Sequence, residues 1–465
     1  MVDNILVKDT IVGLSTPLST SGIGVIRVSG KDAIPLIDKI FKGKDKLINA
    51  DTHTVHYGHI YNVKKVVDEV LVTVMKAPRT YTREDVVEIS CHGGIYIIRE
   101  ILDLIISLGI RPSEPGEFTK RAFLNGRIDL TQAEAVMDLI SSENEKAHDN
   151  ALMQLSGVLQ KKVGDFREAI IHETAYIEAA LDDPEHYDLT GYQEDLKIKL
   201  LRLRDEMKKL ADSFDEGVYI KEGIITAIVG KPNVGKSSLL NSLLQRERAI
   251  VTEIPGTTRD TIEENVMIGG ISLHLIDTAG IRETNDIVEK IGVEKSLSSM
   301  KEADLILYLI DGSQPLSDED KDQLSYFSSD EYSDKPVIVL INKSDLELEF
   351  NIKEIEDKFD GSLIVCSAKN RDGFDELSDK IKEIFFKGKT FGDDDFYLTG
   401  EREKNELLNS VKSIDLVLDS IENEMSEDFL TIDLLDAYAS LGRIIGEQIE
   451  DDLADRIFSE FCMGK

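Results

Sequence analysis

The segment that most constrains this chain is the run Gly-Lys-Pro-Asn-Val-Gly-Lys-Ser at residues 230–237. It follows an apolar strand signal at residues 224–229 and leads into a helical signal that opens at Ser237. A phosphate-binding loop needs this order of strand, glycine-rich turn and helix. Gly230 and Gly235 allow successive backbone N–H groups to face a phosphate. The run therefore predicts a doubly wound α/β domain that binds a nucleoside triphosphate.

The polar residues of this loop have expected roles. Lys236 reaches the β- and γ-phosphates, the Ser237 hydroxyl ligates Mg²⁺, and the helix N-terminus adds positive potential. The residues of this segment that we expect to contact the nucleotide are Asn233, Gly235, Lys236, Ser237 and Ser238.

Two further segments indicate that the base is guanine. The tetrapeptide Asn342-Lys343-Ser344-Asp345 follows the apolar run 337–341, so it lies at the carboxyl end of a predicted strand, where α/β sheets bind ligands. Asp345 can accept two hydrogen bonds from guanine N–H groups, and adenine lacks that pair of donors. The apolar run 363–366 is followed by Ser367, Ala368 and Lys369, which we call the guanine-binding segment. A backbone N–H of this segment can donate a hydrogen bond to the guanine carbonyl.

A fourth motif, Asp277-Thr278-Ala279-Gly280, ends the predicted strand 271–276. Asp277 can hold Mg²⁺ through water, and the Gly280 N–H can contact the γ-phosphate. Taken together and in this order, the four motifs resemble those of GTPases of the translation-factor-related class.

Length and composition bound the rest of the chain. Its 465 residues predict two to four domains. No apolar run approaches membrane-spanning length, and the first 20 residues resemble neither a signal peptide nor a transit helix. The three cysteines, Cys91, Cys366 and Cys462, are too scattered for a disulfide or zinc framework. We expect a cytoplasmic protein without a membrane partner.

The formal net charge of −35 argues against a nucleic-acid binder that works alone. Residues 1–120 hold 15 basic and 15 acidic side chains, whereas residues 389–465 hold 7 basic and 20 acidic ones. If RNA is a substrate, a basic partner is expected to supply much of the affinity. The alternative is that the acidic residues simply form solvated helix faces.

Residues 1–120 read as mixed α/β with turns. Strand signals cover residues 22–28 and 85–89, helical spacing covers residues 97–108, and residues 111–116 read as a loop. From about residue 130 the pattern becomes helical. One apolar stripe on a predicted long helix comprises Leu196, Leu200, Leu203, Met207, Leu210 and Phe214; the same spacing recurs from Leu407 to Ile421 and from Leu434 to Ile457.

Such stripes must be buried against something. The simplest packing is one helical domain built from both flanks of the GTPase segment, which is then an insertion; two separate helical modules are the alternative. The expected domains are an N-terminal domain (1–122), a first helical part (123–218), a GTPase domain (219–388) and a second helical part (389–465).

Three motifs outside the GTPase segment are more specific than the phosphate-binding loop. They are Asp-Thr-Ile-Val with Gly-Ile-Gly-Val-Ile-Arg-Val-Ser-Gly at residues 9–30, Pro-Gly-Glu-Phe-Thr-Lys-Arg-Ala-Phe-Leu-Asn-Gly at 115–126, and Cys-Met-Gly-Lys at 462–465. With these motifs the whole chain resembles the tRNA-modification GTPase family MnmE, also called TrmE.

The resemblance implies an activity and a set of partners. A homodimer would work in a heterotetramer with an FAD-dependent partner, MnmG (GidA). Together they would add an aminomethyl or carboxymethylaminomethyl group to the five-position of the wobble uridine of certain tRNAs. The one-carbon unit would come from 5,10-methylenetetrahydrofolate or 5-formyltetrahydrofolate on the N-terminal domain, which also dimerises. By motif matching, the folate contacts would be Arg27, Glu88 and Arg127. Some members of the family carry Lys at the position that corresponds to Arg127.

The resemblance also assigns chemistry to Cys462, because a cysteine in the family's C-x-G-K form is thought to act in the modification. It would have to approach the folate of its own or of the opposite subunit. His92, in Cys91-His92-Gly93-Gly94, is a candidate acid or base, but a packed or turn histidine is the simpler interpretation, and Cys91-His92 lacks metal-ligand spacing.

GTP cleavage would follow an unusual route. Ile281 stands after Gly280, so no glutamine orients the attacking water at that position. In the family, a potassium ion bound when two GTPase domains meet supplies the missing positive charge. Asn233 matches the family's K⁺ ligand, and backbone carbonyls near Thr252 and Ile254 would complete the shell.

The same resemblance assigns the switch residues. Thr258 would ligate Mg²⁺, with Thr257 as its close competitor. Glu289 would orient the water, and Arg282 would tune the switch region. The rival interpretations are a ribosome-assembly GTPase of the Era or Der type without modification chemistry, and a pure switch or scaffold that binds no folate.

Overall fold

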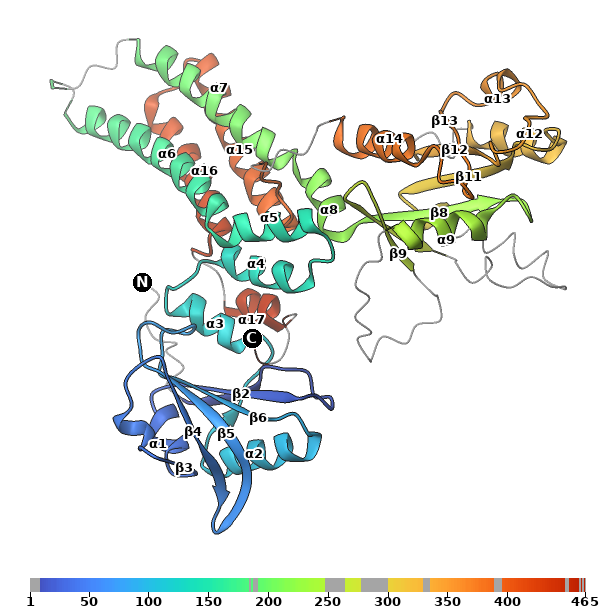
Figure 1. Cartoon of the computed structure of the whole chain (residues 1–465). Coiled ribbons are helices and arrows are strands. Elements are labelled where there is room, and N and C mark those ends of the chain that lie inside the picture. Colours follow the sequence, from blue (N-terminus) through green and yellow to red (C-terminus); the bar gives the residue numbers. More distant parts are fainter. Residues whose placement is uncertain are drawn as a thin grey trace. The chain divides into compact units, whose positions relative to one another are not determined.

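The computed structural model describes residues 9–183, 185–186, 191–246, 264–276, 300–328, 335–388, 395–447, 451–459, 461 and 464. The chain forms two compact units, each assembled from separate segments (Figure 1). The first unit comprises residues 1–137, 154–192 and 419–465, and the second comprises residues 138–153 and 193–418. The four-domain division expected from the sequence is finer than this one and stays a prediction.

A seven-stranded sheet in the first unit has the strand order β3-β4-β5-β6-β2-β1-β7. All neighbouring strands are antiparallel except β1 and β7. The strands are β1 (Ile11–Leu14), β2 (Ile23–Ser29), β3 (Phe41–Gly43), β4 (Thr54–Asn62), β5 (Lys65–Met75), β6 (Val86–His92) and β7 (Arg111–Pro112).

Alternation along these strands separates the two faces of the sheet. Val70, Val72 and Val74 of β5 are buried, whereas Glu69 and Leu71, on either side of Val70, are exposed. The buried face forms one core with two helices, α1 (Ala33–Ile37) and α2 (Ile95–Ser107), and a short 3-10 helix lies at Leu47–Asn49. The opposite face of the sheet bears polar side chains of β2 and β6.

Helices from distant parts of the chain pair within the first unit. Helix α6 (Val158–Asp182) packs along α16 (Glu427–Ile444), and α17 (Asp451–Ser459) packs against α3 (Glu117–Leu124) (Figure 1). The Arg167 guanidinium of α6 lies 4.1 Å from the centre of the Tyr438 ring on α16. The GTPase segment separates α6 from α16 in sequence, so its two flanks meet in space. Helix α4 (Leu130–Ser141) begins in this unit and ends in the second, to which most of α5 (Glu145–Leu155) belongs.

The second unit contains a six-stranded sheet with the order β13-β12-β11-β8-β10-β9, in which only β9 runs antiparallel to its neighbour. Its strands are β8 (Ile224–Gly230), β9 (Glu264–Ile268), β10 (Ile271–Ile276), β11 (Leu305–Asp311), β12 (Val337–Asn342) and β13 (Ser362–Val365). The helices around it are α9 (Lys236–Arg246), α12 (Asp318–Phe327), α13 (Lys353–Glu356) and α14 (Phe374–Phe386). The near-continuous burial of β11 and β12 is typical of parallel strands covered on both faces.

The remaining helices of the second unit are α7 (Tyr192–Ala211), α8 (Phe214–Glu222) and α15 (Glu401–Glu422). Beyond the predicted end of the GTPase segment, the backbone of Tyr397 is held by the buried side chain of Asn150. Its Nδ2 donates to the Tyr397 carbonyl at 3.0 Å, and its Oδ1 accepts from the Tyr397 N–H at 2.9 Å.

Three local expectations need correction. The stripe from Leu196 to Phe214 is not one helix, because α7 ends at Ala211 and α8 begins at Phe214. The Ser213 hydroxyl binds the Leu210 carbonyl and the Leu398 N–H in the intervening turn. The stripe from Leu434 to Ile457 is likewise divided between α16 and α17, and Gly446 between them has a φ of +95°. Finally, the predicted loop at 111–116 opens with the short strand β7.

Candidate functional sites

The phosphate-binding loop follows β8, a central strand of the parallel sheet, and leads into α9. Gly230 and Gly235 have φ values of +147° and +104°, which strongly favour glycine. A Cβ on Gly235 would also lie 2.2 Å from the Asn342 Nδ2 atom. Both predicted glycines are therefore required by backbone conformation, and Gly235 is required by packing as well.

The Lys236 ammonium group is held by the loop itself. It donates to the carbonyls of Gly230 and, at 2.9 Å, Lys231. Burial lowers its pKa. An anionic phosphate is a stronger partner for this ammonium than two neutral carbonyls are, so the loop is built to exchange its own carbonyls for a phosphate.

Asn342 fastens two loops together at the same edge of the sheet. Its Nδ2 donates to the Val234 carbonyl at 2.8 Å, and its Oδ1 accepts from the Ala368 N–H at 2.9 Å. Only 2% of the residue is exposed. The expected contact of Asn342 with the nucleotide stays a prediction; its bonds within the protein also give it a positioning role between the phosphate-binding loop and the guanine-binding segment.

Asp345 is the residue that we expect to accept hydrogen bonds from guanine, and its carboxylate is positioned by neighbouring side chains. The Ser367 hydroxyl donates to its Oδ1 at 2.7 Å, and Lys369 lies 3.8 Å from its Oδ2. The hydrogen bond from Ser367 is the main influence that lowers the pKa of Asp345. An ionised carboxylate accepts hydrogen bonds only, which suits two N–H donors of guanine. Lys343, at a φ of +67°, directs its ammonium to Asp311 at 2.6 Å.

The other residues predicted to contact the nucleotide or its metal ions fall into two groups. Asn233, Ser237 and Ser238 lie on the loop and the start of α9, and Asn233 has a φ of +66°. The remaining predicted residues of this region lie outside the described residues: Thr252, Ile254, Thr257, Thr258, Asp277, Gly280, Arg282 and Glu289. The magnesium, potassium and water-orienting roles assigned to them stay predictions.

A second site lies in the first unit, on the polar face of the seven-stranded sheet. Arg27 and Glu88 are directly opposite each other in the β2–β6 pair, and Arg27 Nε donates to Glu88 Oε1 at 2.8 Å. The two side chains are only 16% and 27% exposed. Register between two strands thus brings together two residues that are 61 positions apart.

Tyr81 joins the third predicted residue to this pair. The guanidinium carbons of Arg127 and Arg27 lie 4.7 Å and 5.7 Å from the centre of the Tyr81 ring. Arg127 also donates to the Tyr81 carbonyl at 3.0 Å. Two of the three predicted folate residues therefore lie near one aromatic ring, and the third, Glu88, joins them through its bond with Arg27. Tyr81 was not predicted, because its neighbours in sequence carry no signal for this role.

The motif at residues 115–126 has a structural explanation. Glu117 and Arg121 are buried and pair at 2.9 Å, while Arg111 pairs with Glu117 at 2.6 Å. Thr119 binds the Tyr81 hydroxyl at 2.9 Å. This segment thus fixes the position of Tyr81 and leads directly to Arg127.

The C-terminal motif also reaches the second site. The carbonyl of Gly464 accepts a hydrogen bond from Arg27 Nη1 at 3.4 Å and one from the Ser15 hydroxyl at 3.3 Å. Gly464 has a φ of +88° and packs against the backbone of Leu14. Cys462 lies outside the described residues, so its proposed chemistry stays a prediction.

The other candidates of the N-terminal domain fit structural roles. His92 Nδ1 is paired with the buried Asp68 at 2.7 Å. Burial raises the pKa of Cys91 to about 11, which makes it a poor nucleophile. In the described part of the chain, no group of three His, Cys, Asp or Glu side chains is placed to hold a metal ion. Nor does any helix in those described ranges have the length and apolar character to cross a membrane.

The parallel sheet, the phosphate-binding loop after β8, and Asp345 at the same edge define a P-loop domain of the Ras-like GTPase class. Two family models match most of the chain: "GTP-binding protein TrmE N-terminus" over residues 10–127 and "MnmE helical domain" over residues 130–462.

Several relatives are named tRNA modification GTPase MnmE. Those from Lachnoclostridium phytofermentans and Bacillus mycoides are 51% and 46% identical over 460 and 461 residues, covering 98% of this chain and 99% of each relative. The relative from Alkaliphilus oremlandii is 47% identical over 99% of this chain and 100% of its own length. This chain belongs to the MnmE family of tRNA modification GTPases.

A solved structure of a point variant of Aquifex aeolicus Era is 29% identical over 42% of this chain and 67% of its own, with a TM-score of 0.26. A score this low does not establish a shared fold.

Proposed function

We propose that this chain hydrolyses GTP and uses a tetrahydrofolate one-carbon donor to modify tRNA. The product would be an aminomethyl or carboxymethylaminomethyl group on the five-position of the wobble uridine, made with the FAD-dependent partner MnmG (GidA). The observation that carries this proposal is the convergence of Arg27, Glu88 and Arg127 around Tyr81 in a chain that also holds a guanine-type nucleotide site.

The cluster suits a folate ligand. The donor has carboxylates at one end and a pterin ring with N–H donors at the other. Two guanidinium groups against one aromatic ring offer N–H donors to the carboxylates, and the Glu88 carboxylate offers an acceptor to the pterin. Gly464 beside Arg27 would bring the C-terminal Cys462 near the one-carbon unit.

The nucleotide site supports GTP as the second ligand. Asp345 would accept two guanine N–H groups, the Ala368 segment would contact the guanine carbonyl, and Lys236 would bind the β- and γ-phosphates. Ser237, Thr258 (with Thr257 as its competitor) and Asp277 would hold Mg²⁺, which neutralises charge on the phosphates.

For hydrolysis, we propose the potassium-dependent route of the family. Asn233 and the backbone near Thr252 and Ile254 would hold K⁺ when two GTPase domains of a homodimer meet. Glu289 would orient the attacking water and Arg282 would tune the switch segment. A cation at this point is worth about 10³-fold or more in rate. Equal hydrolysis rates in KCl and NaCl, or an undiminished rate in Glu289→Ala, would contradict this part of the proposal.

The test of the folate function is an equilibrium titration of the full-length protein with 5-formyltetrahydrofolate. We expect saturable binding that Arg27→Ala weakens at least tenfold, because one charge-assisted hydrogen-bonding group is lost. The matched control is Arg99→Ala, an exposed arginine on α2 of the same domain. If the unaltered protein binds no folate, an Era- or Der-type GTPase without modification chemistry becomes the better interpretation.

A further inference from the structure

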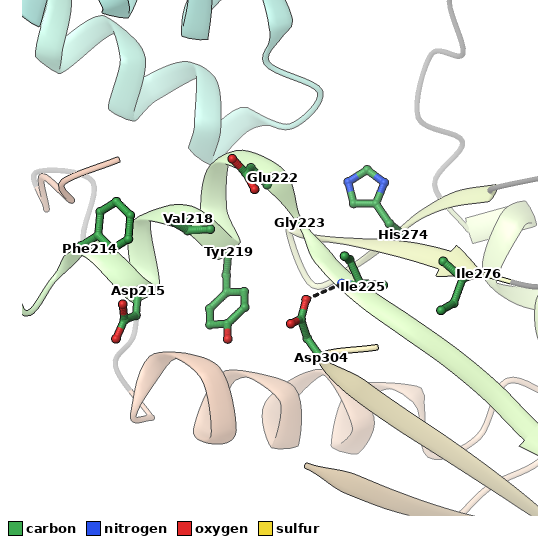
Figure 2. Close-up of a pocket in the computed structure, with 10 residues that line it drawn as sticks. All are labelled: Phe214, Asp215, Val218, Tyr219, Glu222, Gly223, Ile225, His274, Ile276 and Asp304. Atoms are coloured by element: carbon green, nitrogen blue, oxygen red, sulfur yellow. Dashed lines mark hydrogen bonds between the residues drawn. The ribbon is translucent and has the colours of Figure 1, made fainter. Parts of the chain in front are cut away.

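A cavity of about 500 Å³ lies beside the amino-terminal end of β8, whereas the phosphate-binding loop follows the carboxyl end of that strand (Figure 2). Its volume falls within the range of small-molecule sites. One wall is a face of α8, and the other is formed by β8, β10 and Asp304. Gly223, with a φ of +77°, joins α8 to β8 at the floor of the cavity.

The walls between the charged groups are apolar. Phe214 and Val218 are four residues apart on α8 and so share one face. Ile225 of β8 and Ile276 of β10 line the opposite wall (Figure 2). A ligand seated here needs an apolar body.

Most polar groups around the cavity accept hydrogen bonds. Asp215 and Glu222 project from α8, and Asp304 lies across from them with one carboxylate oxygen bonded to the Ile225 N–H at 3.0 Å (Figure 2). Burial together with the charges of Asp304 and Asp215 raises the pKa of Tyr219, so its phenol stays protonated. A ligand that matches this lining must bring donors.

His274 adds a further polar side chain to the lining. The Glu143 carboxylate accepts from Asn265 Nδ2 at 2.8 Å, which leaves Asn265 Oδ1 to face His274 Nδ1 at 2.5 Å. Because that oxygen can only accept, His274 Nδ1 carries the proton. The Nε2 atom lies on the cavity side near Gly223.

A side chain of this protein already shows which kind of chemical group binds to part of the cavity lining. The Lys404 ammonium lies 4.3 Å from the centre of the Phe214 ring and 3.0 Å from Asp215. A primary ammonium is thus already bound by one aromatic face and one carboxylate of the lining. Glu222 and Asp304 form no ion pair with a cation among the described residues.

We propose that this cavity binds a linear aliphatic polyamine, with its methylene chain on the apolar walls and its ammonium groups at the carboxylates. At Asp215 the ligand's terminal ammonium would take the place of the Lys404 ammonium. Asp215 and Glu222 are seven residues apart, which corresponds to about 10 Å along a helix axis. A ligand with terminal ammonium groups at about that separation reaches both ends of the cavity. The proposal is independent of the tRNA-modification function.

The test exploits the absence of tryptophan from the sequence. In Phe214→Trp, the only tryptophan lines the cavity, so its fluorescence reports occupancy. We would titrate this variant at 150 mM KCl with 1,3-diaminopropane, 1,5-diaminopentane and 1,8-diaminooctane, which carry equal charge. Affinity should rise at least about tenfold from the shortest to the longest diamine. The monoamine 1-aminooctane, of the same apolar length, should bind more weakly than the longest diamine. Calorimetry on the unaltered protein is the independent measurement.

The carboxylates are tested by Glu222→Gln with Asp304→Asn, which keeps side-chain shape and removes two charges. We expect roughly tenfold weaker binding of spermidine and of the longest diamine, in line with two partly exposed ion pairs. The control, Glu356→Gln with Asp357→Asn, makes the same charge change on exposed residues of the same unit and should leave affinity unchanged. The proposal would be overturned if diamine affinity did not depend on the length of the diamine, or if affinity fell equally in both double variants.

Discussion

Gly235 and Asn342 are complementary in shape: a Cβ on the glycine would lie 2.2 Å from the Asn342 Nδ2 atom, and that nitrogen binds the carbonyl of neighbouring Val234 at 2.8 Å. Asn342, at the end of β12, thus supports the phosphate-binding loop. Because it also binds the Ala368 N–H, one buried amide links the predicted phosphate site to the predicted guanine site.

Asn342→Ala should weaken both recognition functions at once. The substitution leaves the Val234 carbonyl and the Ala368 N–H without their partner, and each unsatisfied buried group costs about 1–3 kcal/mol. We expect GDP and GTP to bind at least tenfold more weakly, measured by fluorescence titration with labelled nucleotides. Asn370→Ala, an exposed asparagine nearby, is the control. Affinities that match the unaltered protein would show that Asn342 does not position the site.

Asp345→Asn should change the preferred base. A carboxylate accepts from both guanine N–H groups, whereas a carboxamide offers one acceptor and one donor. Xanthine, with a carbonyl in place of the amino group, matches that pattern. We expect GTP hydrolysis at a fixed low concentration to fall tenfold or more, while xanthosine triphosphate hydrolysis rises. Competition between the two triphosphates measures the switch. Retained GTP preference would refute the role of Asp345 in base selection.

Tyr81 should control folate affinity through its ring rather than its hydroxyl. Tyr81→Leu removes the surface against which Arg27 and Arg127 lie, at 5.7 Å and 4.7 Å from the ring centre. Cation–π contacts of this kind are worth about 0.5–2 kcal/mol each, so 5-formyltetrahydrofolate should bind roughly tenfold more weakly.

Tyr81→Phe is the matched control, because it keeps the ring and loses only the bond to Thr119. Its affinity should stay within about threefold of the unaltered protein. Equal losses in both variants would mean that the hydroxyl, and not the ring, organises the cluster.

Glu117→Gln should destabilise the N-terminal domain. Arg121 is 3% exposed and keeps Asp9 and Glu84 as partners, so we expect about 3 kcal/mol, the lower end for breaking a buried ion pair. Hydrogen exchange of β1 and β2 peptides in urea would localise the loss to this domain. Glu114→Gln, on an exposed neighbour, should have little effect.

The effect should also depend on pH. Burial alone would raise the pKa of Glu117, but hydrogen bonds from Arg111, the Glu114 N–H and Arg121 hold it below its usual value. A carboxyl with a lowered folded-state pKa stabilises the protein above its unfolded pKa of about 4.3 and loses that contribution as pH falls. The stability gap between the unaltered protein and Glu117→Gln should therefore narrow below about pH 4. A gap that widens on acidification would contradict the ion-network explanation.

Much of the nucleotide site could be read from the sequence. The strand before Gly230, the helix after Lys236 and the segments at Asn342 and Ser367 all appear near the expected positions. The sequence signals for these elements are local, because the glycines that a turn requires and the apolar residues that a buried strand requires lie within a few neighbouring positions. Arg27, Glu88 and Arg127 were found only through resemblance to a family.

Other relationships were decided by tertiary structure alone. Nothing local in the sequence places Tyr81 between Arg27 and Arg127, brings Gly464 to β2, or makes Asn342 a link between two loops. These contacts depend on packing between segments that can be hundreds of residues apart, and the periodicity of one segment does not show which other segment it packs against. The division of two helical stripes, at 212–213 and near Gly446, also follows from contacts and backbone conformation that helical spacing does not record.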